Sequence, residues 1–455
     1  MGGMPQVGII GLGVNNQPLV RFFLDRGIAV AVADRRPRNA IEETLSRLGV
    51  ESDQVHIAAG EEYLQNLSRW PLKEVYVTPG MKKNVPEIHV LASRGTRITC
   101  ETNLFLELCP APVIGITGSA GKTTTTTLLG MGLKQDGRHP VHVGGNIGTS
   151  LLPRLPQIRP SDWVVMELSS FQLELVTRSP HGAAILNLSP NHLDIHGDFS
   201  AYRAAKAHIW DFQSDDDWAL IPADDAGLAS LFRGHRAAPT WFSLQTVPPH
   251  GSGLDHGWLV WQAEGQRVPI IARDRLKMPG EHNVANALAA IALHMMAGGH
   301  PDAISEVLGI FDGVPHRLEK VREHDSIIYI NDSIATAPDR TMAALNAIRQ
   351  PIILIAGGYD KHLEYETLGQ AIAQSTVRAV IVLGQTGEKI AHAVQQSGRQ
   401  IPVQQVADLA TAVIAARKAA RPGDVVLLSP ASASYDMFLN FEERGQRFRE
   451  LVQGL

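Results

Sequence analysis

The chain has 455 residues, of which 44% are hydrophobic and 19% are charged. At roughly 100–200 residues per domain, this length predicts about two to four domains, each large enough for its own hydrophobic core. The formal net charge of -5 argues against a non-specific nucleic-acid-binding protein, because such a protein needs a basic face.

The first hundred residues alternate short apolar runs with amphipathic stretches. Residues 7–10 are predicted to form a strand, followed by a glycine-containing turn and a helix that runs to residue 25. Further strands are predicted at residues 28–33, which end just before Asp34, and at residues 75–78. This βαβ pattern indicates a parallel sheet, and it predicts a Rossmann-like domain over residues 1–108.

A second domain is predicted over residues 109–312. Residues 113–117, 163–166 and 184–188 have the pattern of strands with polar ends. Between residues 216 and 279 the pattern changes to short alternating runs, which indicates a β-rich portion before a helix that begins near Asn283. These features, together with the glycine-containing loop that follows residues 113–117 and opens a helix, predict a P-loop-type ATP-binding domain.

The segment at residues 313–316 resembles a linker, and it precedes the third predicted domain, residues 313–455. Strands are predicted there at residues 327–330, 352–356, 379–383 and 425–428, with helices between them. The expected fold class is therefore α/β with three domains, of which the first and the last are Rossmann-like.

Only two cysteines are present, Cys100 and Cys109, which are too few for a disulfide framework and indicate a reducing compartment. The first residues contain neither the basic region nor the long apolar segment of a signal peptide. No apolar run approaches the ~20 residues that span a bilayer. We therefore expect a cytoplasmic protein that does not insert into membranes. In line with its net charge, it is not expected to bind nucleic acid, and it is expected to be a monomer.

Residues 117–124 carry the strongest local signal in the chain. They follow a predicted strand and open a predicted helix, which is the setting of a phosphate-binding loop. Glycines let backbone N–H groups approach phosphates, and the helix N-terminus adds a favourable dipole. The spacing departs from the usual GxxxxGK[ST], because position 116 is Ile116. The predicted ATP-binding residues of the loop are Gly118, Ser119, Ala120, Gly121, Lys122, Thr123 and Thr124, with Lys122 directed at the terminal phosphates and Thr123 at Mg²⁺.

Other polar side chains follow the next strands of this domain. Glu167 follows the strand at 163–166, where a carboxylate is placed to bind Mg²⁺ directly or through water. His192 and Asp194 lie just beyond the strand at 184–188 and would reach the same edge of the sheet. Taken alone, each of these residues also fits a solvated or capping role. Lys206 lies in a helical run and looks, by spacing alone, like an ordinary surface lysine.

The turn after the first strand contains Gly11 and Gly13 and resembles a dinucleotide-binding fingerprint, but its third glycine is replaced by Asn16. Arg35 follows Asp34 and suits a phosphate-bearing ligand. An NAD-dependent dehydrogenase is therefore an alternative, although it leaves Lys122 and Glu167 unexplained. A non-catalytic switch that binds a nucleotide only to move its domains is a second alternative.

Taken together, the motifs resemble the Mur ligases over essentially the whole chain. The phosphate loop is common to these ligases and to folylpolyglutamate synthases. The runs ELSSFQLE at 167–174, YRAAK at 202–206, GGNIG at 144–148, PHR at 315–317 and SPASAS at 429–434 are similar to the glutamate-adding members. The resemblance implies an ATP-dependent ligase of peptidoglycan precursor synthesis that adds D-glutamate to UDP-N-acetylmuramoyl-L-alanine through an acyl-phosphate.

The resemblance also implies roles that spacing does not show. Binding of the UDP-linked substrate is implied for Gly13, Val14, Asn15, Asn16, Arg35, Gly80 and Asn146. Metal binding is implied for Thr123, Glu167, His192 and Lys206, the last as a carbamate derived from CO₂, and catalytic roles for Lys122, Lys206 and His192. Contacts with ATP are implied for Asn283, Asn286, Arg317 and Asp332. Contacts with the incoming glutamate are implied for Lys361, Ser434 and Phe441.

One position departs from the family pattern. The commonest form has a lysine after Asn-Asp-Ser, whereas here Ile334 follows Asn331, Asp332 and Ser333. A cation near the amino-acid site is therefore missing or supplied elsewhere. A related ligase for another amino acid, such as L-glutamate, consequently stays open.

Overall fold

The computed structural model describes residues 4–146, 150–191, 193–278, 280–361 and 363–455. The chain divides into two compact units, Met1–Asp312 and Gly313–Leu455. It contains a parallel sheet near the N-terminus, a mixed central sheet and a mixed C-terminal sheet, which confirms the predicted α/β fold class. Among the helices of the described residues, none combines the length and apolar character needed to cross a membrane.

The first sheet has the order β3-β2-β1-β4-β5, and all its neighbouring strands are parallel. Its strands are β1 (Val7–Ile10), β2 (Val30–Asp34), β3 (His56–Ala59), β4 (Glu74–Val77) and β5 (Arg97–Thr99). The accompanying helices are α1 (Gln17–Leu24), α2 (Arg38–Arg47), α3 (Tyr63–Leu67) and α4 (Pro86–Ser93), with a 3-10 turn η1 (Ser52–Gln54). The central strands are buried on both faces, which explains their continuous apolar runs.

The strand predicted at residues 28–33 begins two residues later than expected. Gly27 adopts a left-handed conformation (φ 68°), and the N–H of Ile28 donates to the carbonyl of Phe23 at 3.0 Å. This arrangement closes helix α1 in the manner of a Schellman motif. Ile28 therefore belongs to the helix terminus, although its apolar side chain fits a strand.

The central sheet has the order β14-β13-β12-β11-β10-β9-β6-β8-β7. Its parallel strands are β6 (Val113–Thr117), β7 (Val141–Gly145), β8 (Trp163–Glu167), β9 (Gly182–Ile185), β10 (Trp218–Pro222), β11 (Ala238–Ser243) and β12 (Gly251–Asp255). The antiparallel strands β13 (Trp258–Ala263) and β14 (Gln266–Ala272) complete it and confirm the β-rich portion.

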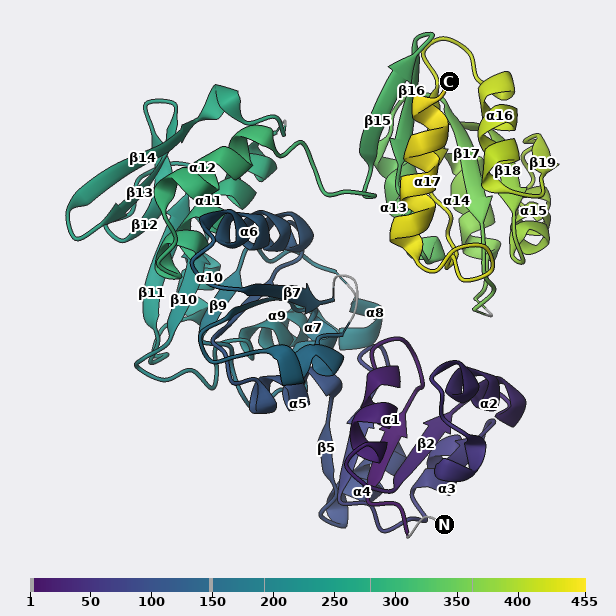
Figure 1. The fold of residues 1–455 in the computed structure, drawn as a ribbon, viewed down its shortest axis with the longest axis horizontal. Helices are drawn as coiled ribbons and strands as arrows, with labels where there is room; N and C mark the ends of the chain where they lie inside the picture. Colours follow the sequence, from purple (N-terminus) through teal and green to yellow (C-terminus); the bar gives the residue numbers. More distant parts are fainter. Residues whose placement is uncertain (1–3, 147–149, 192, 279, 362) are drawn as a thin grey trace. The chain divides into compact units, whose positions relative to one another are not determined.

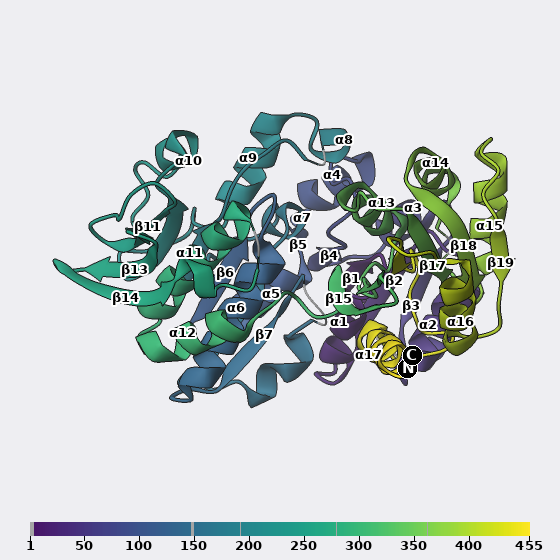
Figure 2. The same cartoon turned by 90° about the horizontal axis from the view of Figure 1, so that it is seen from above.

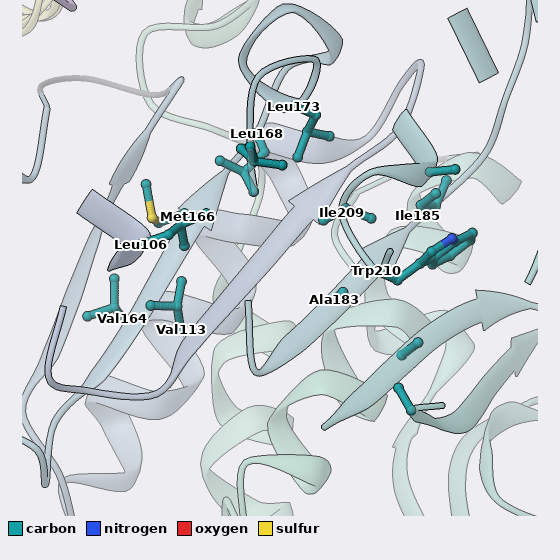
Figure 3. Close-up of a cluster of buried hydrophobic side chains, with 14 of the residues drawn as sticks. Leu106, Val113, Val164, Met166, Leu168, Leu173, Ala183, Ile185, Ile209 and Trp210 are labelled. Atoms are coloured by element: carbon teal, nitrogen blue, oxygen red, sulfur yellow. The ribbon is translucent and has the colours of Figure 1, made fainter. Parts of the chain in front are cut away.

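Helices cover the central sheet. They are α5 (Glu101–Leu108), α6 (Lys122–Asp136), α7 (Ser170–Leu173), α8 (Leu193–His196), α9 (Phe199–Ala207), α10 (Ala226–Leu231), α11 (Glu281–Met296) and α12 (Pro301–Ile310), with 3-10 turns η2 (Leu152–Gln157) and η3 (Arg273–Arg275). Helices α6, α11 and α12 pack against one another (Figure 1). A hydrophobic cluster contains Leu106 of α5, Met166 of β8 and Trp210, which follows α9 (Figure 3). The strands that lead to the phosphate loop and to Glu167 therefore start from a rigid, packed base.

The strand predicted at residues 184–188 ends earlier, at Ile185. Beyond it, the N–H of Leu186 donates to the carbonyl of Thr117 at 3.0 Å, and the carbonyl of Asn187 accepts from the N–H of Ser119 at 3.0 Å. The N–H of Leu186 thus still pairs with the last residue of β6, and the regular ladder ends where the carbonyl of Asn187 pairs with the loop after β6.

The C-terminal sheet has the order β15-β16-β20-β17-β18-β19, in which only the edge pair β15–β16 is antiparallel. Its strands are β15 (Glu319–His324), β16 (Ile327–Asn331), β17 (Ile352–Gly357), β18 (Val377–Leu383), β19 (Val403–Gln405) and β20 (Val425–Leu428). Its helices are α13 (Pro338–Ala347), α14 (Glu366–Gln374), α15 (Gly387–Gln396), α16 (Leu409–Ala419) and α17 (Phe441–Gln453), which Figure 2 shows from above. The parallel strands β16, β20 and β17 are neighbours, so the loops after them meet at one edge of the sheet.

Candidate active site

The loop between β6 and α6 has the geometry of a phosphate-binding loop. Gly118 and Gly121 have φ values of 155° and 82°, in the region that favours glycine. A Cβ atom on Gly121 would lie 2.2 Å from Oδ1 of Asn286. The close approach of helix α11 to this loop therefore requires glycine at position 121.

Replacing Gly121 by alanine is expected to distort the loop and weaken ATP binding. The left-handed conformation alone costs an alanine about 1–2 kcal/mol, and the clash with Asn286 adds to that cost. Gly137, at the other end of α6, is a matched control, since it has φ 71° and its Cβ position lies 4.0 Å from the nearest atom, the carbonyl oxygen of Gln135. Both variants should lower the melting temperature, but only Gly121→Ala should raise KM for ATP; equal KM values would refute the steric argument.

The loop is held in place by residues that the sequence motif did not single out. The side chain of Asn187 accepts from the N–H of Ala120 at 2.9 Å and donates to its carbonyl at 3.0 Å. Ser119 Oγ donates to the carbonyl of Ser189 and lies 3.0 Å from the hydroxyl of Tyr202. Asn187 lies two residues after the end of β9. A polar residue just after a strand was the signal from which its contact with the loop could have been predicted.

Lys122 opens helix α6, and its ammonium folds back over the loop. Its Nζ donates to the carbonyl oxygens of Gly118 at 2.9 Å and of Ser119 at 3.4 Å. The ammonium thus lies at the concave side of the loop, where phosphate oxygens could replace the two carbonyl groups as acceptors.

A buried carboxylate lies next to the loop. Glu167 is 3% exposed, and its two oxygens accept from the hydroxyl of Thr123 and from the side-chain amide of Asn146, both at 2.8 Å. The negative charge of Glu167 is hydrogen-bonded to neutral groups, and hard oxygen donors of this kind suit Mg²⁺. Among the described residues, no three His, Cys, Asp or Glu side chains gather into a metal cluster. The predicted ligand His192 lies outside the described residues, as do Ile147 and Gly148 of the GGNIG run.

Lys206 is not the surface lysine that its helical spacing indicates. It is 2% exposed, and its Nζ donates to the hydroxyl of Thr117 at 3.1 Å, at the end of β6. Its Nζ also lies 5.0 Å from the centre of the Tyr202 ring. Burial and then the positive charge of Lys122 lower the pKa of Lys206 to about 6, against the opposing effect of Glu167. A neutral amine at this place can react with CO₂.

Two asparagines of helix α11 border the same loop. Asn286 is buried and meets Gly121, while its side-chain amide donates to Oδ1 of Asn283 at 3.3 Å. The structure thus brings Asn286, Thr123, Glu167 and Lys206 to one edge of the central sheet, with Asn283 one helical turn away.

The N-terminal turn packs against the loop after β4. A Cβ atom on Gly11, whose φ is 78°, would lie 2.7 Å from the side chain of Thr78. Gly13, Val14 and Gly80 are exposed beside this contact and are available to a ligand. Together they border the carboxyl edge of the first sheet, where nucleotide ligands bind in folds of this kind.

Asn16 itself is fully buried, and its side-chain amide donates to the carbonyl of Ile10 at 2.9 Å. Its side chain therefore stabilises the turn from inside the protein and is not exposed to a ligand. Of the predicted substrate residues here, Gly13, Val14 and Asn15 lie nearer the surface.

The acid at the end of β2 already has partners within the protein. Asp34 accepts from the N–H of Leu12 at 2.8 Å and forms an ion pair with Arg36 at 2.9 Å. Hydrogen bonds from Arg36 and Leu12 overcome the effect of burial and lower the pKa of Asp34. Arg35, the predicted substrate residue, is exposed and pairs with Glu61 at 3.2 Å. An exposed pair of this kind is weak and can exchange Glu61 for a phosphate.

In the C-terminal unit, Asp332 follows β16 and is 4% exposed. It accepts from the hydroxyl of Ser429 at 2.7 Å and from the N–H of Leu318 at 3.2 Å. Burial raises the pKa of Asp332 to about 6 in spite of these hydrogen bonds. Arg317, one residue before Leu318, adds a nearby positive charge, so the two residues predicted to contact the nucleotide are neighbours.

The three residues predicted to contact the incoming glutamate come from different elements of this unit. Lys361 follows β17, and its Nζ lies 6.0 Å from the centre of the Tyr435 ring. Ser434 is buried in the loop after β20, and Phe441 opens helix α17 and accepts at its carbonyl from the hydroxyl of Ser333 at 2.8 Å. All three therefore lie at the carboxyl edge of the C-terminal sheet.

Models of three protein families match the chain in succession. Residues 5–100 match the Mur ligase MurD-like N-terminal domain, residues 116–294 the Mur ligase middle domain, and residues 316–432 the glutamate ligase domain of Mur ligases. A UDP-N-acetylmuramoylalanine--D-glutamate ligase of Symbiobacterium thermophilum is 43% identical over 99% of this chain and 98% of that protein. One of Acetivibrio thermocellus is 39% identical over 99% and 96% of the two chains.

Solved structures share the fold at lower identity. A UDP-N-acetylmuramate-alanine ligase from Thermotoga maritima is 20% identical, with a TM-score of 0.51 over 99% of this chain and 100% of the other. The MurF structure from Acinetobacter baumannii is also 20% identical, with a TM-score of 0.51 over 78% of this chain and 79% of that one. Both likenesses concern the fold alone.

Proposed function

Because this chain belongs to the Mur ligase family, we propose that it joins D-glutamate to UDP-N-acetylmuramoyl-L-alanine with hydrolysis of ATP, in peptidoglycan precursor synthesis. The full-length similarity to D-glutamate ligases supports the substrate pair. The observation that carries the chemistry is the buried set of Thr123, Glu167 and Lys206 around a phosphate loop. Family membership removes the dehydrogenase alternative, and Asp34, held by Arg36 and Leu12, agrees with that.

The phosphates of ATP are proposed to lie on residues 118–124, where backbone N–H groups and the start of α6 favour negative charge. Lys122 would exchange its carbonyl acceptors for phosphate oxygens. Thr123, Glu167, His192 and a carbamate on Lys206 would hold Mg²⁺, which supplies charge neutralisation when bound. Asn146 keeps the carboxylate of Glu167 oriented toward Thr123.

The reaction follows from this placement. A carboxylate oxygen of the alanyl group attacks the terminal phosphorus of ATP, the bond to ADP breaks, and an acyl-phosphate forms. The amine of glutamate then attacks the acyl carbon, phosphate leaves, and the nitrogen loses a proton. Lys122 and the loop N–H groups stabilise charge that develops on the transferred phosphoryl group.

Residues of the C-terminal unit are also proposed to take part in the reaction. Arg317 and Asp332 are proposed to contact the nucleotide from the C-terminal unit, and Lys361, Ser434 and Phe441 to receive glutamate there. The segment at 313–316 is the proposed hinge, since Gly313 has φ 144°, a conformation open to few other residues. Exclusion of water from the reacting groups would protect the acyl-phosphate from hydrolysis.

The test is an ADP-release assay with UDP-N-acetylmuramoyl-L-alanine and a panel of amino acids. ADP is expected in step with a new amide bond, and D-glutamate is expected to have the highest kcat/KM. Equal ADP release without an amino acid would contradict a ligase, and no release with any amino acid would favour a non-catalytic switch. A preference for L-glutamate would refute the stereochemical assignment but leave the ligase mechanism intact.

A further inference from the structure

Three cationic side chains, Arg340, Lys361 and Arg444, come from elements at one edge of the C-terminal sheet. Three loops meet there, after β16, β17 and β20. The hydroxyl of Thr341, in the first turn of α13, donates to the carbonyl of Ser429 at 3.2 Å, and Ser429 in turn donates to Asp332. These bonds tie the start of α13 to the loops that follow β16 and β20.

The buried side chain of Arg444, in α17, is hydrogen-bonded to the loops after β16 and β20. It is 2% exposed, and its guanidinium donates to the hydroxyl and carbonyl of Ser333 and to the carbonyls of Ser432 and Ala433, all within 2.9–3.1 Å. A Cβ atom on Gly358 would lie 3.1 Å from Nη1 of Arg444. Burial lowers the pKa of Arg444 to about 9, so it stays charged at neutral pH.

Every hydrogen-bond acceptor described for Arg444 is neutral, and a buried charge is stable only when other charges or dipoles compensate it. Asp436 is a nearby opposing charge but makes no described hydrogen bond with Arg444. The buried guanidinium of Arg444 therefore gives this edge of the sheet a positive electrostatic potential.

Arg340 and Lys361 extend this positive charge to the surface. Arg340 lies next to Thr341 in the first turn of α13, and Lys361 lies three residues beyond Gly358. Both are exposed, and neither has a carboxylate partner among the described residues. The three cations share the edge at which the loops after β16, β17 and β20 meet. Desolvation and the positive charges of Arg340 and Arg444 lower the pKa of Lys361.

We propose that Arg340 is a specificity-determining residue that binds one carboxylate of the incoming amino acid while Lys361 binds the other. The inference rests on the proposed function and adds a residue that the family pattern does not supply. Arg444 is a positioning residue, because it holds the loops of Ser333 and Ala433 and does not reach the surface. Two surface cations match the two carboxylates of glutamate, and an amino acid with one carboxylate would leave one of them unpaired.

Arg340 can also replace the cation that is missing at Ile334. Ile334 lies in the loop after β16, where the commonest family form has lysine. Arg340 lies in the first turn of the helix that follows this loop, and the neighbouring Thr341 is tied to the loop through Ser429 and Asp332. A longer, planar donor six residues along the chain thus supplies the cation from a different backbone position.

The test measures KM for D-glutamate, ATP and the UDP-linked substrate in Arg340→Ala and in Arg340→Lys. Arg340→Ala should raise KM for D-glutamate about 10- to 100-fold, the effect of losing a hydrogen bond between charged groups. The other two KM values should stay within twofold of wild type. Arg340→Lys should recover part of the loss.

Two further variants separate a charge effect from a folding effect. Arg349→Ala removes another exposed arginine just past the end of α13 and should leave all three KM values unchanged. Adding Ile334→Lys to Arg340→Ala should restore binding of D-glutamate, because it returns a cation to the edge. If wild type itself does not use D-glutamate, the proposed function fails; if it does and Arg340→Ala leaves KM for D-glutamate unchanged, or raises KM for ATP instead, the inference fails.

Discussion

Replacing Lys206 by arginine is expected to lower kcat at least about 100-fold, the upper end of the loss seen when a group that supports a metal is removed. Lys206 is buried beside Thr117 at the end of β6, and its lowered pKa of about 6 leaves the amine neutral at neutral pH. A neutral amine adds to CO₂, forms an N–C bond and releases a proton, which turns the side chain into an anion. Arginine keeps a positive charge and cannot make this change.

The carbamate itself can be observed. With ¹³C-bicarbonate, wild type should show a carbamate signal by NMR, and Lys206→Arg should lack it. Lys134→Arg is the matched control, because Lys134 is exposed on helix α6 and should affect neither signal nor turnover. Near wild-type turnover of a folded Lys206→Arg, or an unchanged signal, would rule out the carbamate.

The same lysine makes stability depend on pH in a defined direction. Its folded pKa of about 6 lies below the ordinary value of 10.5, so the unfolded chain binds one more proton between these values. The contribution of the unmodified amine to stability therefore rises with pH across this window. A Lys206→Met variant should show a smaller increase in unfolding free energy from pH 6 to pH 10.

Replacing Lys122 by alanine is expected to lower kcat/KM for ATP by about 10³- to 10⁵-fold, as for other single cations that stabilise a transferred phosphoryl group. Its ammonium already lies over the loop, at 2.9 Å from the carbonyl oxygen of Gly118. Loss of the Lys122 ammonium removes a positive charge from the place where the phosphoryl group carries most negative charge. Both the affinity for ATP and the rate of phosphoryl transfer should therefore fall. Steady-state ADP release and nucleotide titration measure the two effects separately.

Lys134→Ala, on the same helix, serves as the control and should leave kcat/KM for ATP and nucleotide binding unchanged. Since the charge of Lys122 also contributes to lowering the pKa of Lys206, Lys122→Ala should raise that pKa and weaken the carbamate signal. The signal should not disappear, because burial, the larger cause of the lowered pKa, remains. A loss of less than tenfold, with an intact fold, would contradict the role given to Lys122.

Features that depend on neighbours along the chain could be read from the sequence. The alternation of apolar runs and helical stretches predicts the parallel sheets, because each strand and helix buries its own apolar face. The glycines and Lys122 after β6 predict the phosphate loop for the same local reason. Errors fell at element ends. At residue 28 the backbone N–H donates to the carbonyl of Phe23 in the preceding helix, and just beyond residue 186 the carbonyl of Asn187 accepts from the N–H of Ser119 in the phosphate loop.

Only the tertiary structure decided which groups are buried together. Thr123 meets Glu167 across 44 residues, and Lys206 meets Thr117 across 89. A helical spacing cannot tell an exposed lysine from one that neighbouring strands and Tyr202 enclose. The lowered pKa of Lys206 follows from this enclosure, because desolvation and charge act through space and not along the chain. The gathering of Arg340, Lys361 and Arg444 depends on loops that are distant in the sequence and meet at one edge of the C-terminal sheet.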